Sequence, residues 1–312
     1  MTTLSLILVA ALWGGFFVVG TLSVHHAAPL AVGAWRFLLA TPLFFALYLP
    51  RRRMEVRPTR RDWLVLAGMG ATGVFGYNWI SFEAMQRASA ADGAMITPAL
   101  HPLLTLFLAG LLFGESVTLA RLLGLAVAIL GEGLVFHEAI ATFATHPDRL
   151  VGDLLYLAAA VCWSCYTLLG RAASRRLSPL ATSAYSSAIG TLMLVPVGGS
   201  ELLRVPFTWQ AWPFWAGVAY LSVGGTVVAF WLWHRGIAKV GASRAASFSY
   251  LVPVFALGLS VLMLHERPSP LQLLGTSLVL AGVVLANAGT WGRMPGGWRI
   301  MQANVRTGEE AS

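Results

Sequence analysis

Two basic side chains lie inside strongly apolar stretches of the sequence, Arg36 in WRFLLATPLFF and His101 in ITPALHPLLTLF. An ionisable group in such surroundings is costly to bury and is therefore a candidate for binding or proton transfer. Arg36 could hold a carboxylate through two parallel hydrogen bonds, or it could bond a helix-end carbonyl and fix two helices together. His101 could bind a ligand or exchange a proton near neutral pH, or it could be an ordinary hydrogen-bonded histidine between helices.

Three prolines, Pro98, Pro102 and Pro253, interrupt apolar stretches, and the first two flank His101. A proline inside a helix has no N–H group to donate and frees the carbonyl group one turn earlier. In lipid, a freed carbonyl group is tolerated only where it faces protein or a water-filled cavity. We therefore expect these prolines to mark the wall of a cavity and the points at which two helices bend.

Aromatic and polar side chains fall at comparable depth in several apolar stretches, and Trp163 and Tyr166 share one helix face because they are three residues apart. An apolar cavity with a few convergent polar groups suits a small amphipathic or aromatic ligand. The candidate substrate-binding residues are Trp13, Arg36, Tyr77, Asn78, His101, Trp163, Tyr166 and Tyr250. The tryptophans expected at membrane interfaces instead are Trp63, Trp209, Trp212, Trp215 and Trp233.

The composition excludes a soluble fold. Of the 312 residues, 57% are apolar and only 11% are charged, and the mean hydropathy is +0.71. Soluble domains average about 45–50% apolar and about 25% charged residues, so this chain has too little charge to cover a water-exposed surface. Soluble, disordered and disulfide-scaffold proteins are therefore excluded, which leaves a multi-pass membrane protein.

Ten stretches of the sequence are long enough to cross a bilayer as helices, since each has about 20 mostly apolar residues. They are continuous apolar runs rather than alternating strands, so the sequence predicts an all-α membrane protein and not a barrel. The short connections leave no room for a soluble domain. The predicted segments are 3–23, 30–50, 63–82, 93–113, 118–136, 151–170, 180–199, 212–234, 244–264 and 270–290.

The basic residues predict the orientation of these segments. If the segments alternate across the membrane, 16 Lys and Arg residues fall on the side of the N-terminus, and 4 fall on the other side, Arg87, Arg149, Arg204 and Arg267. An excess of basic residues marks the cytoplasmic side, so we expect a multi-pass protein of the cell inner (plasma) membrane with both termini cytoplasmic. The net charge of +8 then reflects topology and contact with membrane lipid, and no nucleic-acid partner is expected.

The two halves of the chain resemble each other. AALWG at 10–14 aligns with AVCWS at 160–164, and similar matches continue to the end of the segments at an offset of 150 or 151. Each half has five predicted segments, and because five is odd, the second half must enter the membrane from the opposite side. Inverted repeats are typical of secondary transporters, whose site lies between the halves. The expected units are a first five-helix repeat at 1–138, an external linker at 139–150, a second repeat at 151–290 and a cytoplasmic tail at 291–312.

These features resemble the EamA family of the drug/metabolite transporter superfamily over residues 5–290. The residues that carry the resemblance are Trp13-Gly14, Arg36-Phe37, the pairs Pro102/Glu115 and Pro253/Glu266, and Gly124 with Gly275. The resemblance implies ten helices around a central cavity and export of small metabolites or drugs by alternating access, without naming a substrate. The sequence departs from the pattern in its second half, where Tyr185 and Ser186 stand at the position of Arg36 and no basic residue is found.

Two motifs that suggest cofactors lie inside apolar segments. GMGATG at 68–73 matches a dinucleotide-binding fingerprint, and Cys162 with Cys165 forms a C-x-x-C pair. Within a membrane helix, small residues that let helices approach closely explain both motifs better. Ser243 and His265 cannot form a catalytic dyad, because 22 residues of helix span about 33 Å. We expect no cofactor, no metal site and no enzymatic activity.

The sequence therefore predicts a transporter that exports small organic metabolites or amino acids. An organophosphate or nucleotide-sugar-type exchanger is the alternative within transport, although it would require several basic groups in the cavity. An intramembrane enzyme and a non-transporting sensor are the alternatives from other classes. Gly110 and Gly114 could pack helices within one chain or between two chains. The sequence is therefore compatible with a homodimer.

Overall fold

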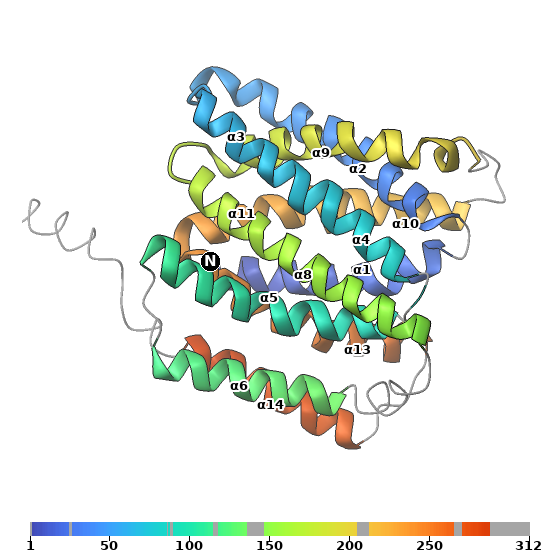
Figure 1. Ribbon diagram of the computed structural model, residues 1–312, viewed down its shortest axis with the longest axis vertical. Coiled ribbons are helices and arrows are strands. Elements are labelled where there is room, and N and C mark those ends of the chain that lie inside the picture. Colours follow the sequence, from blue (N-terminus) through green and yellow to red (C-terminus); the bar gives the residue numbers. More distant parts are fainter. Residues whose placement is uncertain are drawn as a thin grey trace, which may run out of the picture.

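In the computed structural model, every regular element of the described residues is a helix (Figure 1). The structure describes residues 2–24, 27–85, 87, 90–114, 118–135, 147–204, 212–264 and 270–287, so the predicted tail and most of the predicted linker lie outside the described residues. The helices are α1 (Thr2–Val24), α2 (Pro29–Tyr48), η1 (Leu49–Met54), α3 (Arg60–Met69), η2 (Gly70–Gly76), α4 (Tyr77–Met85), α5 (Ala90–Phe113), α6 (Leu119–Val135), α8 (Pro147–Ala173), α9 (Pro179–Leu202), α10 (Trp212–Ser222), η5 (Val223–Val228), α11 (Ala229–Val240), α12 (Ala242–Ser247), η6 (Phe248–Tyr250), α13 (Leu251–Leu264) and α14 (Pro270–Asn287).

Within the described ranges, seven helical runs are long and apolar enough to cross a membrane. Two further apolar helices, Leu122–Gly131 and Leu273–Ala286, are shorter and fall in the predicted fifth and tenth segments. The predicted third segment is the run α3–η2–α4. The all-helical membrane architecture is confirmed, and the count of ten crossings stays a prediction.

Proline and small polar residues begin several helices. α2 starts at Pro29 and α9 at Pro179, where the fixed φ angle of proline suits the first turn and no hydrogen bond is lost. The Ser178 hydroxyl accepts a hydrogen bond from a backbone N–H group in the first turn of α9. At the start of α3, Thr59 and Asp62 form a capping box, in which each side chain bonds the backbone of the other residue.

An ion pair joins the start of α3 to the loop after α8. Nε of Arg176 lies 3.3 Å from Oδ2 of Asp62, and the N–H and hydroxyl groups of Thr59 donate to the same oxygen at 2.8 and 2.7 Å. Burial is the strongest single influence on this carboxyl group and opposes its ionisation, but the hydrogen bonds from Thr59 and the charge of Arg176 together outweigh it and lower the pKa of Asp62. Asp62 is therefore a carboxylate at neutral pH.

Two of the long helical runs contain π-helical turns, which we call the π segments. η2 (Gly70–Gly76) joins α3 to α4, and η5 (Val223–Val228) joins α10 to α11. They fall in the third and eighth predicted segments, which correspond to each other in the two halves of the sequence. π turns are rare and are found frequently at functional sites.

Helices from the two halves of the chain pack against each other (Figure 1). α2 packs on α9, α5 on α8, and α1 on α13. α6 and α14 form a separate pair at one edge of the molecule, drawn at the bottom of Figure 1. A Cβ atom at Gly131 would lie 2.6 Å from the carbonyl oxygen of Gly275, and one at Gly124 would lie 2.6 Å from that of Gly282. The backbones of α6 and α14 are therefore in direct contact, as small residues permit.

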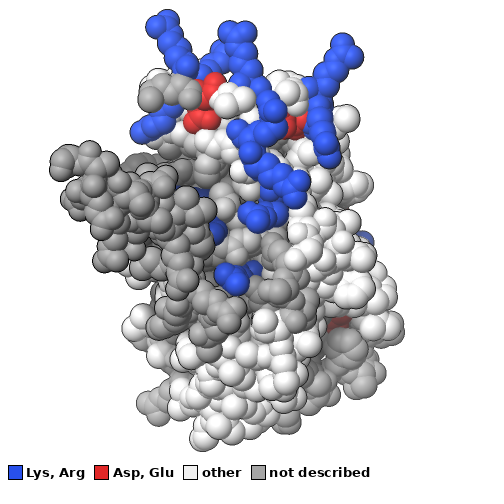
Figure 2. All heavy atoms as spheres, turned by 90° about the vertical axis from the view of Figure 1, so that its left-hand side faces the viewer, with Lys and Arg blue, Asp and Glu red and all other residues white. Residues whose placement is uncertain are grey.

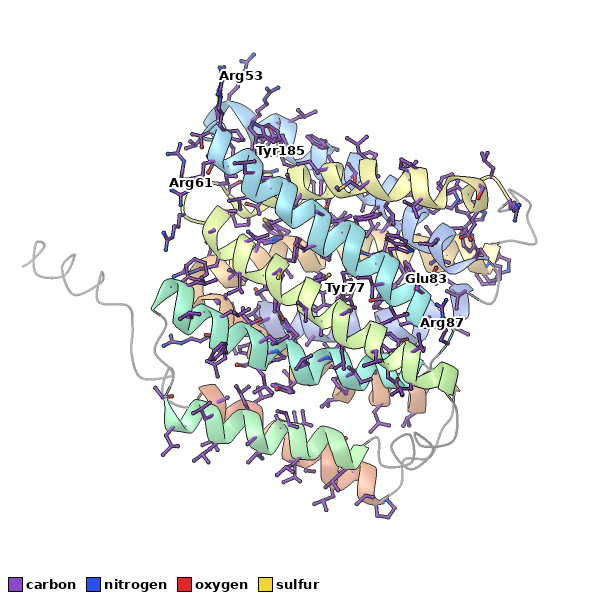
Figure 3. The ribbon with its side chains drawn as sticks, viewed as in Figure 1. Arg53, Arg61, Tyr77, Glu83, Arg87 and Tyr185 are labelled. Atoms are coloured by element: carbon purple, nitrogen blue, oxygen red, sulfur yellow. The ribbon has the colours of Figure 1, made fainter. Side chains whose placement is uncertain are left out.

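Charged side chains concentrate at one end of the helices. Figure 2 shows Lys and Arg gathered on the face that lies at the left of Figure 1, and Figure 3 labels Arg53 and Arg61 there. The ion pair between Glu83 and Arg87, with atoms 2.7 Å apart, lies at the opposite end (Figure 3). The middle of the outer surface is apolar, and leucines such as Leu192 are up to 76% exposed there, as expected for side chains that face lipid.

Candidate functional site

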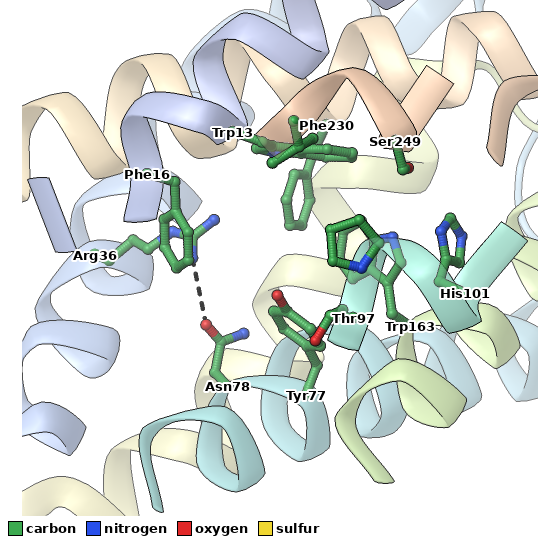
Figure 4. A pocket seen from close by; sticks show the side chains of 12 residues that line it. Trp13, Phe16, Arg36, Tyr77, Asn78, Thr97, His101, Trp163, Phe230 and Ser249 are labelled. Carbon is green, nitrogen blue, oxygen red and sulfur yellow. Dashed lines mark hydrogen bonds between the residues drawn. The ribbon is translucent and has the colours of Figure 1, made fainter. Parts of the chain in front are cut away.

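A cavity of about 50 Å³ lies between helices of both halves (Figure 4). A volume of this size holds a few water molecules. Its walls come from α1, α2, α4 and α5 of the first half and from α8, α11, η6 and α13 of the second half. The lining residues are Trp13, Phe16, Arg36, Tyr77, Asn78, Thr97, Pro98, His101, Trp163, Phe230, Ser249 and Val252.

Aromatic rings cover one side of this cavity. The ring of Trp13 lies 5.1 Å from that of Trp163, edge to face, and 5.0 Å from that of Trp233, measured between centroids. The rings of Tyr77 and Phe230 lie 5.0 and 5.7 Å from Trp163. Edge-to-face and tilted contacts at these distances are the favourable arrangements of aromatic rings. The result is a rigid apolar wall that can cover a ring or an alkyl group of a ligand.

Arg36 provides the positive charge among the described lining residues. Its side chain is buried, with 3% exposure, and its Nε donates to Oγ1 of Thr226 at 2.6 Å. Nη1 donates to Oδ1 of Asn78 at 3.3 Å (Figure 4), and Nη2 donates to the carbonyl oxygen of Gly225 at 3.2 Å. Among the described residues, all of these acceptors are neutral, so the charge of the guanidinium is hydrogen-bonded but not neutralised.

His101 lies on α5 between its two prolines and is 1% exposed. Its Nε2 atom is 3.4 Å from Oγ1 of Thr167, and its carbonyl oxygen accepts a hydrogen bond from Ser164 at 3.3 Å. Its ring lies 6.4 Å from Trp163 and 6.0 Å from Trp233. His101 therefore stands at the edge of the aromatic wall, within reach of α8.

The structure brings most of the predicted site residues to this cavity, namely Trp13, Arg36, Tyr77, Asn78, Pro98, His101 and Trp163. Tyr166 and Tyr250 are fully buried and are not among the lining residues. Tyr166 packs behind Trp163, with ring centroids 5.0 Å apart. Pro102 lies within α5, and Pro253 lies in the first turn of α13, directly after the 3-10 turn η6. Their proposed role in bending stays a prediction.

Five lining residues were not predicted from the sequence, Phe16, Thr97, Phe230, Ser249 and Val252. Helical spacing could have found two of them, because Phe16 is three residues after Trp13 and Thr97 is four residues before His101. Ser249 could have been found as well, because it is the residue whose carbonyl group Pro253 frees.

The expectation that Trp233 lies at the membrane interface is wrong. Its side chain is 1% exposed and packs against Trp13 and His101. The predicted eighth segment ended at residue 234, whereas α11 continues to Val240. Trp233 therefore lies about two turns inside the helix.

The described part of the chain contains no group of three or more His, Cys, Asp or Glu side chains that could hold a metal ion. Cys162 and Cys165 are both partly buried free thiols on α8. The glycines of the GMGATG motif pack against neighbouring helices, and a Cβ atom at Gly70 would lie 2.9 Å from the backbone nitrogen of Gly190. The structure thus uses this motif for helix packing.

Comparison with known proteins places this fold and cavity in a family. The sequence pattern of the EamA-like transporter family matches residues 1–136 and, a second time, residues 150–288. The chain belongs to the EamA-like transporter family. Members of this family are multi-pass membrane transporters, so the cavity described above belongs to a transport protein.

Relatives of this EamA-like transporter carry names of transporters and exporters. The chain is 31% identical to the probable terminal-alkyne amino-acid exporter of Streptantibioticus cattleyicolor over 246 aligned residues. The aligned region covers 76% of this chain and 77% of that protein. The chain is 27% identical over 231 residues to the aromatic amino acid exporter YddG of Ancylobacter novellus, at coverages of 73% and 77%. The uncharacterized transporter YyaM of Bacillus subtilis is 28% identical over 276 residues, at coverages of 88% and 89%.

A solved crystal structure has the same fold as this EamA-like transporter. The two superpose with a TM-score of 0.77 over 92% of this chain and 96% of the other chain. Their sequence identity is 24%, so the likeness concerns the fold.

Proposed function

We propose that this EamA-like transporter exports small organic metabolites or amino acids that have an aromatic or amphipathic body, by alternating access. The observation that carries the proposal is the buried Arg36 guanidinium at the cavity wall, whose described partners are neutral oxygens. A ligand carboxylate would supply the missing negative charge, and the rings of Trp13 and Trp163 would cover the apolar part of the ligand. Relatives that are named as amino-acid exporters support the same substrate class.

The architecture that we propose for transport is ten membrane helices in two inverted five-helix repeats, 1–138 and 151–290, with the substrate site between them. The two separate family matches support the repeats, and so does the reciprocal packing of helices from the two halves. The basic face of the molecule (Figure 2) supports an inner-membrane protein with both termini in the cytoplasm.

An organophosphate exchanger is less well supported by the cavity. A phosphate ester carries up to two negative charges and is usually held by several basic groups. The described lining residues include Arg36 as a cation together with aromatic and neutral polar groups. This composition favours a monocarboxylate with an apolar body over a phosphate.

Flux in proteoliposomes tests the proposal. Vesicles that contain the purified protein would be loaded with a panel of amino acids, aromatic carboxylates and aromatic cations, with and without a pH gradient. We expect protein-dependent efflux of carboxylates with aromatic or branched bodies and little efflux of small polar amino acids. The absence of flux for every compound, with protein that is folded and inserted, would overturn the export function.

The same assay separates facilitated diffusion from proton antiport. If His101 carries the proton, the variant His101→Ala will lose gradient-driven flux and keep exchange of labelled substrate at equal pH. An unchanged dependence on the pH gradient in His101→Ala would reject this role.

A further inference from the structure

We propose that Thr226 and Asn78, one residue from each half of the chain, position the Arg36 guanidinium for the anionic group of the ligand. Neither residue is assigned this role by the family match, and Thr226 is not among the residues that line the cavity. The inference rests on the proposed function, because it assumes that the transported ligand has an anionic group. It adds that the anchor is assembled jointly by η5 and by the first turn of α4, whose Asn78 is bonded to η2.

Asn78 connects the guanidinium to the first π segment. Its Oδ1 atom accepts the hydrogen bond from Arg36, and its Nδ2 atom donates to the carbonyl oxygens of Val74 at 2.7 Å and Gly73 at 3.3 Å. Both carbonyl groups belong to η2, which directly precedes α4 and Asn78. The amide orientation of Asn78 is thereby fixed, with its oxygen toward Arg36.

Thr226 connects the guanidinium to the second π segment in the same way. Its hydroxyl group donates to the carbonyl oxygen of Leu221 at 2.8 Å. The hydroxyl oxygen is therefore left as the acceptor for Nε of Arg36, at 2.6 Å. The neighbouring carbonyl group of Gly225 accepts from Nη2 of Arg36 and also from Nε1 of Trp13, each at 3.2 Å. One edge of the guanidinium is thus held by two consecutive residues of η5.

This arrangement leaves donors for a ligand. A guanidinium group has five N–H donors, and the bonds to Thr226, Asn78 and Gly225 use one on each nitrogen. Within the described residues, one N–H group on each terminal nitrogen remains, so both terminal nitrogens keep a donor that a ligand carboxylate can accept from.

Three aromatic rings restrict the remaining freedom of the side chain. The guanidinium carbon lies 4.6 Å from the ring centroid of Phe16, 5.0 Å from that of Phe37 and 5.9 Å from that of Phe230. Cation–π contacts at these distances stabilise the charge without neutralising it. The guanidinium is therefore oriented before a ligand arrives, which reduces the entropy lost on binding.

Binding measurements with three indole compounds test the role of Thr226. Indole-3-propionate has a carboxylate, tryptamine has an ammonium group, and tryptophan has both. The variant Thr226→Val removes the hydroxyl acceptor at nearly constant volume. We expect it to weaken binding of indole-3-propionate and tryptophan about tenfold, the scale of one hydrogen bond to a charged group, and to leave tryptamine unchanged. Thr226→Ser keeps the oxygen and should bind all three compounds as the native protein does.

Thr191→Val is the matched control for this variant. Thr191 is also a buried threonine whose hydroxyl donates to a carbonyl group one turn earlier, and it contacts Thr41 at 2.9 Å away from the cavity. It should leave all three affinities unchanged. Elution as a single peak on size exclusion verifies folding of each variant. An equal loss for all three compounds, or no loss for the carboxylates in Thr226→Val, would overturn the positioning role.

A double variant tests whether Asn78 and Thr226 act on one anchor. Because Asn78 and Thr226 hold the same guanidinium, the effects of Asn78→Leu and Thr226→Val should not be independent. We expect the double variant to lose clearly less affinity for indole-3-propionate than the product of the single losses. A loss equal to that product would overturn the joint anchor. If the native protein binds none of the three compounds and also gives no flux for any compound of the proteoliposome panel, the proposed function fails instead.

Discussion

The α6–α14 pair and the aromatic cavity are both formed between the two halves of the chain, but they use the repeat in opposite ways. In the α6–α14 pair, Gly124 packs on Gly282 and Gly131 packs on Gly275. Gly124 corresponds to Gly275 and Gly131 to Gly282, so each contact is the counterpart of the other. In the cavity, Arg36 has no basic counterpart, and the two halves contribute different side chains.

This difference indicates which parts of a repeat can stay alike and which must diverge. Close packing of two helices needs only small residues at matching positions. A binding site for an asymmetric ligand needs a charge on one side only. At the position that corresponds to Arg36, the Tyr185 hydroxyl donates to that of Tyr48 at 3.1 Å, and the Ser186 hydroxyl donates to the Thr182 carbonyl at 2.7 Å. In the second half this position is used for packing.

The largest expected effect is on the symmetric side of the comparison, for Gly131→Val. The new side chain would meet the backbone of α14, with its Cβ atom 2.6 Å from an oxygen of Gly275 and a nitrogen of Val279. Backbone atoms cannot move aside as side chains do, so we expect a loss of about 3 kcal/mol or more of stability. Thermal unfolding in detergent measures this loss. Gly133→Val is the control, because a Cβ atom there meets nothing within 4 Å; similar unfolding temperatures for the two variants would contradict the close packing.

The second prediction removes the charge that makes the cavity asymmetric. Arg36→Gln should lower kcat/KM for aromatic carboxylates about 100-fold, which corresponds to roughly 3 kcal/mol. The same variant should change kcat/KM for aromatic cations little. Arg36→Lys should recover part of the loss, since it restores the charge without the planar donors. Proteoliposome flux measures both variants. The control is Arg204→Gln, because Arg204 is exposed. Equal activity of Arg36→Gln and the native protein would exclude a role of Arg36 in substrate binding.

The third prediction concerns the aromatic wall. Trp163→Ala should weaken substrate affinity about tenfold, because Trp163 contacts Trp13, Tyr77 and Phe230 at the cavity. Trp212→Ala should have little effect, because Trp212 is 61% exposed at the start of α10. Equilibrium binding of tryptophan compares the two variants. Equal affinities would show that the wall does not contact the ligand.

The smallest effect is expected at the charged end of the molecule, for Asp62→Asn. The substitution keeps a hydrogen-bond acceptor and removes the charge, and the partner Arg176 is half exposed, so we expect a loss of about 0.5 kcal/mol. Because the pKa of Asp62 is lowered in the folded protein, its contribution is present at neutral pH and is lost as the pH falls below the usual carboxyl range. Unfolding temperatures of the native protein and the variant should therefore differ at neutral pH and converge in acid. A difference in unfolding temperature that grows on acidification would contradict the ion pair. The control is Glu83→Gln, which removes a charge from the ion pair of Glu83 and Arg87.

The helices could be predicted from the sequence because a membrane requires long apolar segments. Much of the cavity could be predicted too, because ionisable and proline residues such as Arg36, His101 and Pro98 are rare in apolar segments and mark polar interior space. The π segments could not be predicted. A glycine-rich stretch such as GATGVFG is equally compatible with an ordinary α-helix that packs closely against a neighbouring helix. Tyr166 and Trp233 show a second limit. Which face of a helix a tyrosine or tryptophan occupies, and how deep it lies, depends on helix bounds and packing that hydropathy does not define.

The reciprocal glycine contacts between α6 and α14 have a consequence for the exchange of residues between the halves. Each contact joins a glycine of one half to the counterpart of the other glycine, so the crossing asks for the same residues from both halves. Position 36 lies outside these contacts. An arginine can therefore be present in one half and absent from the other without disturbing the pairing of α6 with α14.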